Sequence, residues 1–549
     1  MILTRTDTDS APAVMVRSRR RWPRLTLLGL VLAAWLVFGW ALVAQHRALR
    51  SRTYDLAYFD QVIWNTSQGR WFETTFVEFN FLGEHVSLIL LLFALLYRLG
   101  ANLELVLILQ AGAVAGAAVP LAWTTRRLLG SPTAAVLVAL AYLLAAPLHR
   151  AVLFDFHPEL FGIAVIFIAI ALLVADRPTA ALVTIGALIL FKEDAALVGL
   201  GFAWLVWLGG FRRHALLLAG LSLVYGVAVL GVLMPHLRGD APGLMARYGY
   251  LGDGLPNIVE GAVQHPGRVW QQLTSDGPRS GSMRLLVSTA LLPLTSPAGL
   301  ALLPVAVPNL LSTHAPQGSL DGHYGTYPFA LGIVATLLSA QRLLYGRRCK
   351  TCWDANRLPA TRRPIVLAAF LLGFSFVSWY LWSPLGGRFE AANYRVSSHA
   401  AVAQRVMTLI PPEAAVSAQS NLLPHLSRRT WVRDFPRLDG VEYVVVDFQS
   451  WGMWQTTFDI YATVYESLPS LGFCQIYEED GLHLYQHMQQ DTCPPLLEGA
   501  RASSAQRPEE LRQTWSTLLR LGEVGSSAPV GRPTQHFTST AGSGAAAGN

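Results

Sequence analysis

Long apolar segments alternate with short polar segments from residue 25 to residue 384. A helix needs about 20 mostly apolar residues to cross the hydrocarbon core of a bilayer. We therefore expect an all-α polytopic membrane protein with about eleven transmembrane helices in a domain that covers residues 25–387. The expected helices are 25–45, 102–124, 132–148, 160–175, 178–191, 195–210, 214–234, 284–296, 297–313, 327–345 and 364–384.

Two apolar segments depart from this pattern. Residues 86–99 are too short to span a bilayer, and we interpret them as an interfacial helix. Residues 179–209 are interrupted only by the charged tip Lys192, Glu193 and Asp194, which indicates a hairpin of two short helices. The tip is then expected to lie in a protein-lined cavity below the outer surface, where charges are costly and usually functional.

The chain becomes more polar after its last apolar segment. Residues 441–446 are typical of a strand that ends at Asp447, and residues 413–431 are typical of alternating short strands and helices. Residues 388–495, here called the C-terminal domain, are therefore predicted to form a small extracytoplasmic α/β domain.

Three other segments are expected to be loops or tails. Residues 46–101, here called the first loop, and residues 235–283 are expected to be long outer loops. The second is rich in Pro and Gly, and loops of such length are usually functional or disordered. Residues 496–549 are rich in Ser, Ala, Gly and Gln and are expected to form a mostly disordered tail.

Charge sets the expected orientation. The chain has 549 residues, of which 14% are charged, against about 25% in soluble proteins. The formal net charge is +7, and the positive residues are concentrated in short loops that we place in the cytoplasm, as the positive-inside rule predicts. We therefore expect no nucleic-acid partner. Residues 1–24 are then a basic cytoplasmic N-terminus, and the C-terminal domain lies outside the cell (plasma) membrane. The arginines that indicate inner loops are Arg126, Arg127, Arg177, Arg212, Arg213 and the cluster within 342–363.

The four cysteines form two pairs. Cys349 and Cys352 make a C-x-x-C motif in an inner loop, which is only half of a structural zinc site. Cys474 and Cys493 belong to the C-terminal domain, where a disulfide is chemically allowed. The sequence leaves open whether this bond forms.

The acids and histidines that can carry chemistry fall on the outer side. Asp55 and Asp60 follow the first span, about 140° apart on a helix, so they do not form a pair on one face. A partly desolvated carboxylate can act as a general base, because burial raises its pKa. An ordinary interfacial charge is the alternative. Later in this loop, Glu84 suits a helix N-terminus, and His85 can bind an anion or orient a carboxylate.

Asp155, His157 and Glu159 form a candidate site for a divalent cation, Mg²⁺ or Mn²⁺. Pro158 suits the first position of a helix and favours an extended backbone at His157. Asp155 and His157 then project to the same side, with Glu159 in the first helical turn. Asp155 and Glu159 equally suit the start of a helix without any metal.

Lysine and histidine supply further candidates. Lys192 is one of only two lysines in the chain, and it suits a phosphate contact or an ion pair with Glu193 or Asp194. His314 and His323 lie in an outer loop and can contact a phosphate or a metal, although loop histidines are often incidental.

These residues together resemble a family of prokaryotic multipass membrane proteins, domain of unknown function 2079. The likeness covers about residues 50–480. The motifs that carry it are Asp55 to Gly69, Gly83-Glu84-His85, Phe156-His157-Pro158-Glu159, Phe191-Lys192-Glu193-Asp194, His323-Tyr324, Gln419-Ser420-Asn421 and Pro424-His425-Leu426.

The N-terminal third is also similar to the wider GT-C class of integral-membrane glycosyltransferases. The matching pattern is Asp55 after the first span, Gly69 fourteen residues later, and His85 before an apolar helix. The chain departs from the class at Leu56, where a second acid is common, and after His85, where prolines are common. The resemblance implies a polyprenyl-phosphate sugar donor and a general-base role for Asp55, with Asp60 as the second choice.

The expected function is transfer of a sugar from this lipid donor to an extracytoplasmic acceptor, at the extracytoplasmic face of the lipid bilayer. The leaving phosphate needs compensating positive charge, from Lys192, Arg238 or His323. The expected substrate-binding residues are Glu84, His85, Lys192, Glu193, Asp194, Arg238, His323 and Tyr324. A transporter or lipid flippase, with these charges lining a translocation path, is the main alternative; a non-catalytic envelope scaffold is the second.

Overall fold

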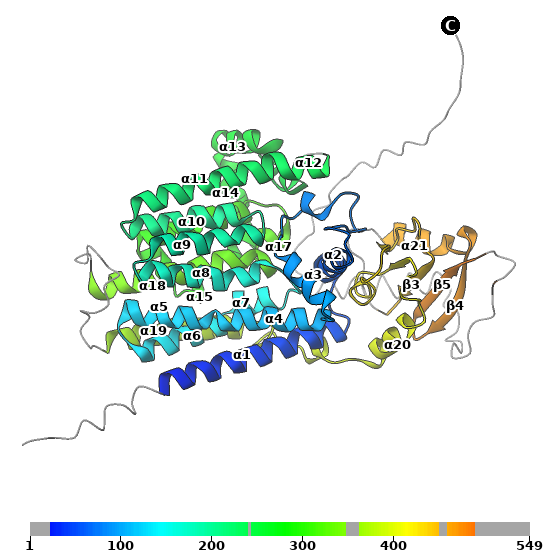
Figure 1. Cartoon of the computed structure of the whole chain (residues 1–549), viewed down its shortest axis with the longest axis horizontal. Helices are drawn as coiled ribbons and strands as arrows, with labels where there is room; N and C mark the ends of the chain where they lie inside the picture. Colours follow the sequence, from blue (N-terminus) through cyan, green and yellow to red (C-terminus); the bar gives the residue numbers. More distant parts are fainter. Residues whose placement is uncertain (1–21, 240–242, 347–361, 450–457, 489–492, 494–549) are drawn as a thin grey trace, which may run out of the picture. The chain divides into compact units, whose positions relative to one another are not determined.

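The computed structural model describes residues 22–239, 243–346, 362–449, 458–488 and 493. Figure 1 shows a bundle of helices and a smaller region that contains a β-sheet. The bundle helices are α1 (Trp22–Arg47), α2 (Tyr58–Ser67), α3 (Leu90–Arg98), α4 (Leu103–Gly116), α5 (Ala118–Leu129), α6 (Pro132–Leu144), α7 (Ala146–Val152), α8 (Glu159–Val174), α9 (Pro178–Gly186), α10 (Ala195–Leu208), α11 (Arg212–Ala228), α12 (Met234–Arg238), α13 (Gly254–Gln264), α14 (Pro266–Leu273), α15 (Asp276–Ser288), α16 (Leu303–Leu310), α17 (Ala315–Gly318), α18 (Thr326–Tyr345) and α19 (Arg363–Trp382).

Local sequence signals explain where several helices begin and end. The side chains of Asn102 and Ser131 accept hydrogen bonds from the backbone N–H groups of Leu105 and Ala134, so they cap the N-termini of α4 and α6. Pro147 has no backbone N–H to continue a helix, and α6 and α7 meet at a 51° bend just before it.

The described helices correct the expected number of spans. Five segments are long and apolar enough to cross a membrane: Pro23–Arg47, Leu103–Leu129, Arg212–Arg238, Ala315–Tyr345 and Arg363–Trp382. The bent pair α6–α7 makes a sixth if it is one span. Four apolar helices are shorter: Glu159–Val174, Pro178–Leu190, Ala195–Leu208 and Pro297–Leu310. The segment 284–296 holds only the end of α15 and a 3-10 turn at Leu292–Thr295, where Pro293 interrupts the apolar run.

The structure also tests the two segments that depart from the regular pattern. Helix α3 has nine residues, about 14 Å at ~1.5 Å per residue, so residues 86–99 do not reach the length of a span. The hairpin over 179–209 is confirmed, because α9 precedes the charged tip and α10 follows it. Within the expected outer loop 235–283, most of the described residues form short helices, from α12 to α15.

The C-terminal domain contains a five-stranded sheet in the order β2-β1-β3-β5-β4. The strands are β1 (Val416–Ala418), β2 (Val432–Asp434), β3 (Tyr443–Asp447), β4 (Phe473–Glu479) and β5 (Leu482–His487), with helices α20 (Ser398–Met407) and α21 (Phe458–Ser467). Strand β1 is parallel to β2 and β3, whereas β5 is antiparallel to β3 and β4. The expected strand at 441–446 and the mixed α/β character are confirmed.

The cysteines of the C-terminal domain are bonded to each other. Cys474 of β4 forms a disulfide with Cys493, which answers the question that the sequence left open. Cys349 and Cys352, the segment 1–21 and the tail 496–549 lie outside the described residues.

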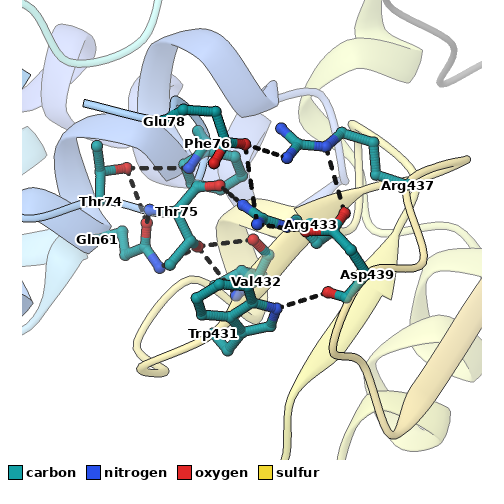
Figure 2. Close-up of polar contacts among 10 residues, drawn as sticks. All are labelled: Gln61, Thr74, Thr75, Phe76, Glu78, Trp431, Val432, Arg433, Arg437 and Asp439. Atoms are coloured by element: carbon teal, nitrogen blue, oxygen red, sulfur yellow. Dashed lines mark hydrogen bonds and ion pairs between the residues drawn. The ribbon is translucent and has the colours of Figure 1, made fainter. Parts of the chain in front are cut away.

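The first loop covers the edge strand β2 (Figure 2). The Thr75 hydroxyl donates to the carbonyl of Val432 at 2.7 Å and accepts from its N–H at 3.1 Å. Gln61 holds Thr75 in turn, because its amide oxygen accepts from the Thr75 N–H and its amide nitrogen donates to the Thr75 hydroxyl, both at 2.9 Å. The same nitrogen donates to the carbonyl of Arg429 at 3.2 Å.

Charged side chains extend this contact on the same side of β2 (Figure 2). Arg437 pairs with Glu78 of the first loop. Arg433 donates to Asp439 at 2.7 Å and to the carbonyl of Thr75. The backbone polar groups at this sheet edge are thus covered by the chain itself, which prevents pairing with another strand.

Replacement of Gln61 by Leu is expected to loosen this docking. Gln61 is fully buried, and the apolar side chain leaves polar groups of Thr75 and Arg429 without partners, at about 1–3 kcal/mol for each unsatisfied group. Limited proteolysis of the purified chain in detergent should cleave the C-terminal domain faster in this variant. Gln68→Leu, at an exposed position, is the control, and equal protection of both variants contradicts the docking role.

Candidate active site

Asp55 lies in a rare backbone conformation next to the C-terminal domain. The π-helical turn Thr53–Ala57 precedes α2, and such turns are frequent at functional sites. The backbone N–H of Thr53 donates to the Ser420 hydroxyl at 3.1 Å. The half-buried Asp55 carboxylate lies 3.5 Å from Nε2 of His157.

Two histidine rings from separate loops meet at this carboxylate. His157 precedes α8, and His323 belongs to the 3-10 turn Gly322–Gly325 before α18. Their rings stack with centroids 4.0 Å apart and an interplanar angle of 16°. One ligand atom each from Asp55, His157 and His323 lies within 4.8 Å of the others. Here these three residues are called the Asp55 group.

Neighbouring residues position both histidines. The Gln110 amide oxygen accepts the backbone N–H of His157 at 2.8 Å, and its amide nitrogen donates to the carbonyl of Asp155 at 2.9 Å. Gly322 has a φ of +55°, and a Cβ there would lie 2.5 Å from the ring of Phe154. Glycine is therefore required beside His323.

The expected metal set of Asp155, His157 and Glu159 does not assemble, because only His157 joins the Asp55 group. Asp155 has a φ of +61°, and its carboxylate accepts the backbone N–H of Arg52 at 3.1 Å. Burial and the neighbouring Asp55 raise the pKa of Asp155 to about 7. Glu159 instead binds Lys192.

The charged tip forms buried pairs with two other segments. Lys192 Nζ lies 2.5 Å from Glu159 Oε1, and both side chains are buried. Glu193 contacts Nδ1 of His85 at 3.1 Å. Asp194 keeps a buried oxygen that has no hydrogen-bond partner among the described residues. The tip thus connects the first loop to the start of α8.

Asp60 has a different environment from Asp55. It is 1% exposed and accepts a hydrogen bond from the Ser427 hydroxyl at 2.6 Å. Tyr97 and Arg428 also contact its carboxylate, the arginine at 3.4 Å. Asp60 therefore joins α2, α3 and the C-terminal domain, and it lies outside the Asp55 group.

The remaining expected residues have separate contacts, of which that of Tyr324 is with the Asp55 group. Tyr324 packs against the His323 ring with centroids 4.0 Å apart. Glu84 accepts a hydrogen bond from the Tyr58 hydroxyl at 2.9 Å. The Arg238 guanidinium lies 4.5 Å from the centroid of the Phe79 ring.

The sequence interpretation missed Arg247. Its guanidinium donates to the Tyr324 hydroxyl at 3.3 Å. The available signal was an arginine next to Tyr248 and Tyr250 within a long outer segment. That pattern alone does not distinguish a site residue from an ordinary surface cation.

A search of curated proteins found no match. Among solved structures, the chain is similar to ArnT from Cupriavidus metallidurans bound to undecaprenyl phosphate, at 14% identity over 86% of this chain and 99% of that chain, with a TM-score of 0.47. The apo state of ArnT gives 14% identity, coverage of 87% and 100%, and a TM-score of 0.48.

The archaeal oligosaccharyltransferase AglB from Archaeoglobus fulgidus, in complex with an inhibitory peptide and a dolichol-phosphate, is similar at 13% identity over 87% of this chain and 75% of that chain, with a TM-score of 0.40. A family model described as predicted membrane protein (DUF2079) matches residues 45–484. The chain therefore belongs to the DUF2079 family and is a multi-pass integral membrane protein.

Proposed function

We propose that this protein is a membrane glycosyltransferase that moves a sugar from a polyprenyl-phosphate donor to an extracytoplasmic acceptor. The observation that carries the proposal is the convergence of Asp55, His157 and His323 from three distant parts of the chain. The resemblance of the first loop to the GT-C class supplies the type of reaction. The four shorter apolar helices are then also embedded in the membrane. Together with the five spans and the bent pair, they make ten membrane segments of a GT-C-like domain.

Asp55 is proposed to act as the general base. It accepts the proton of the acceptor hydroxyl while the hydroxyl oxygen bonds to the anomeric carbon of the sugar. The bond from that carbon to the phosphate oxygen breaks, and the lipid phosphate leaves with the electron pair. Asp55 is better placed for this role than Asp60, whose carboxylate is occupied by Ser427 and Arg428.

The Asp55 group also fits a divalent cation. Two imidazoles and one carboxylate suit Zn²⁺ or Mn²⁺ better than Mg²⁺. His323 keeps a buried Nδ1 that has no hydrogen-bond partner among the described residues, which leaves this nitrogen available as a ligand. Such an ion would supply positive charge for the phosphate oxygens. His157 and His323 would hold it, with one oxygen of Asp55.

The C-terminal domain is proposed to present the acceptor. It contacts the turn that carries Asp55 through Thr53 and Ser420, and it covers the first loop through Thr75 and Val432. An acceptor bound to this domain would therefore reach Asp55 without crossing the bilayer.

Replacement of Asp55 by Asn is expected to lower glycosyl transfer by about 100- to 10,000-fold, the usual contribution of a general base. The assay measures sugar transfer from a polyprenyl-phosphate sugar in membranes that contain equal amounts of protein. Asp276→Asn is the matched control, since its side chain is 97% exposed. Unchanged transfer in the Asp55 variant contradicts the proposal.

A second readout separates the enzyme from the flippase alternative. Movement of a fluorescent polyprenyl phosphate across proteoliposome membranes should not depend on Asp55 if the protein is a transferase. Loss of lipid movement in Asp55→Asn, together with wild-type glycans, supports the flippase instead.

Replacement of either histidine in the Asp55 group by Ala is expected to abolish metal retention. The purified full chain is dialysed against Zn²⁺ or Mn²⁺, and its metal content is measured by mass spectrometry. Retention should also fall on acidification, because the imidazoles must be neutral to bind an ion. His265→Ala, at an exposed site, is the control, and equal metal content in all variants contradicts a cation at this group.

A further inference from the structure

Arg247 is a cation with no part in the reaction outlined above. It is half-buried in the 3-10 turn Gly243–Tyr248. Its carbonyl oxygen accepts hydrogen bonds from the backbone N–H and the hydroxyl of Thr313, at 3.0 and 2.8 Å. This contact fixes the turn to the loop that carries His314 and His323.

The Arg247 guanidinium is held by neutral groups. It donates to Gln317 Oε1 at 2.7 Å and to the Tyr324 hydroxyl at 3.3 Å. Gln317 is itself held by Asn309, at 2.9 Å. A guanidinium has five N–H donors, so others remain for a ligand. Among the described residues, no carboxylate forms an ion pair with Arg247.

Nearby cations differ from Arg247 in this respect. Lys192 pairs with Glu159 at 2.5 Å, and Arg150 donates to Asp321 at 2.5 Å. These charges are already compensated within the protein. Arg247 keeps a positive charge that an anionic ligand can neutralise, and its neutral partners hold the guanidinium without opposing such a ligand.

The position of Arg247 connects it to the Asp55 group. Tyr324, which Arg247 contacts, packs against His323 with ring centroids 4.0 Å apart. Burial and Arg247 lower the pKa of His314 to about 4, while Asp55 acts on the same ring in the opposite direction. His314 is thus neutral beside both charges, and an anion bound by Arg247 would lie close to Asp55.

We propose that Arg247 binds the phosphate of a phosphate-bearing ligand beside the Asp55 group, with Gln317 and Tyr324 fixing its guanidinium. The inference rests on the proposed function and deepens it, because it assigns the lipid phosphate to a residue. Lys192 then serves as an internal partner of Glu159 rather than as the phosphate contact. A lipid headgroup and free phosphate share the chemistry that this site would recognise.

Binding of three probes to the full chain in nanodiscs tests the assignment: farnesyl phosphate, farnesol and inorganic phosphate. Arg247→Gln is expected to weaken farnesyl phosphate binding at least about tenfold and to leave farnesol binding unchanged. Normal farnesol binding also shows that the variant is folded. Arg247→Lys should retain part of the affinity, since it keeps the charge but loses the planar fork. Arg268→Gln, on exposed helix α14, is the matched control.

The outcomes are distinct. If only farnesyl phosphate binding depends on Arg247, the ligand is a lipid headgroup. If binding of inorganic phosphate depends on Arg247 as well, the site recognises phosphate itself. Both results support the proposal. Wild-type binding of farnesyl phosphate by Arg247→Gln overturns it. Asp55→Asn should still bind farnesyl phosphate. If that variant also keeps full transfer activity, the proposed function fails while the phosphate site stands.

Discussion

The buried ion pair between Lys192 and Glu159 is the contact on which the candidate active site depends. Leaving one partner of such a pair uncompensated costs about 3–5 kcal/mol, so the pair keeps the charged tip against the start of α8. His157 lies two residues before Glu159, and the same contact therefore sets the place of its imidazole. The contact between His85 and Glu193 also joins the first loop to the charged tip.

The backbone on both sides of Asp55 is held by contacts with other segments. Among the described residues, no arginine or lysine forms a salt bridge with the Asp55 carboxylate. Upstream, the N–H of Arg52 donates to Asp155; downstream, Asp60 is tied to the C-terminal domain through Ser427 and Arg428. The segment is thus fixed while the Asp55 carboxylate faces His157. A catalytic side chain must be held in its productive position by the surrounding structure, and these contacts hold the segment that carries Asp55.

Features set by local sequence could be predicted, and those set by long-range packing could not. The long apolar run of α1, the interruption of the hairpin at Lys192 and the strand β3 all follow from periodicity and charge. The grouping of His323 with Asp55 joins segments more than 250 residues apart, which spacing does not reveal. The expected cation set failed because Asp155 accepts the N–H of Arg52 and Glu159 pairs with Lys192, and the sequence does not reveal these long-range contacts. The expected span 284–296 is not one helix, because α15 ends at Ser288 and the backbone turns at Ala290 and Leu291, which have positive φ angles.

We propose above that lipid-phosphate chemistry takes place at the Asp55 group. An electron cryomicroscopy map of the full chain with bound undecaprenyl phosphate tests this most directly. Phosphate density is expected between Arg247 and the carboxylate of Asp55, beside His323 and Tyr324. A phosphate bound on another part of the protein, with the Asp55 group remote from it, would contradict the claim.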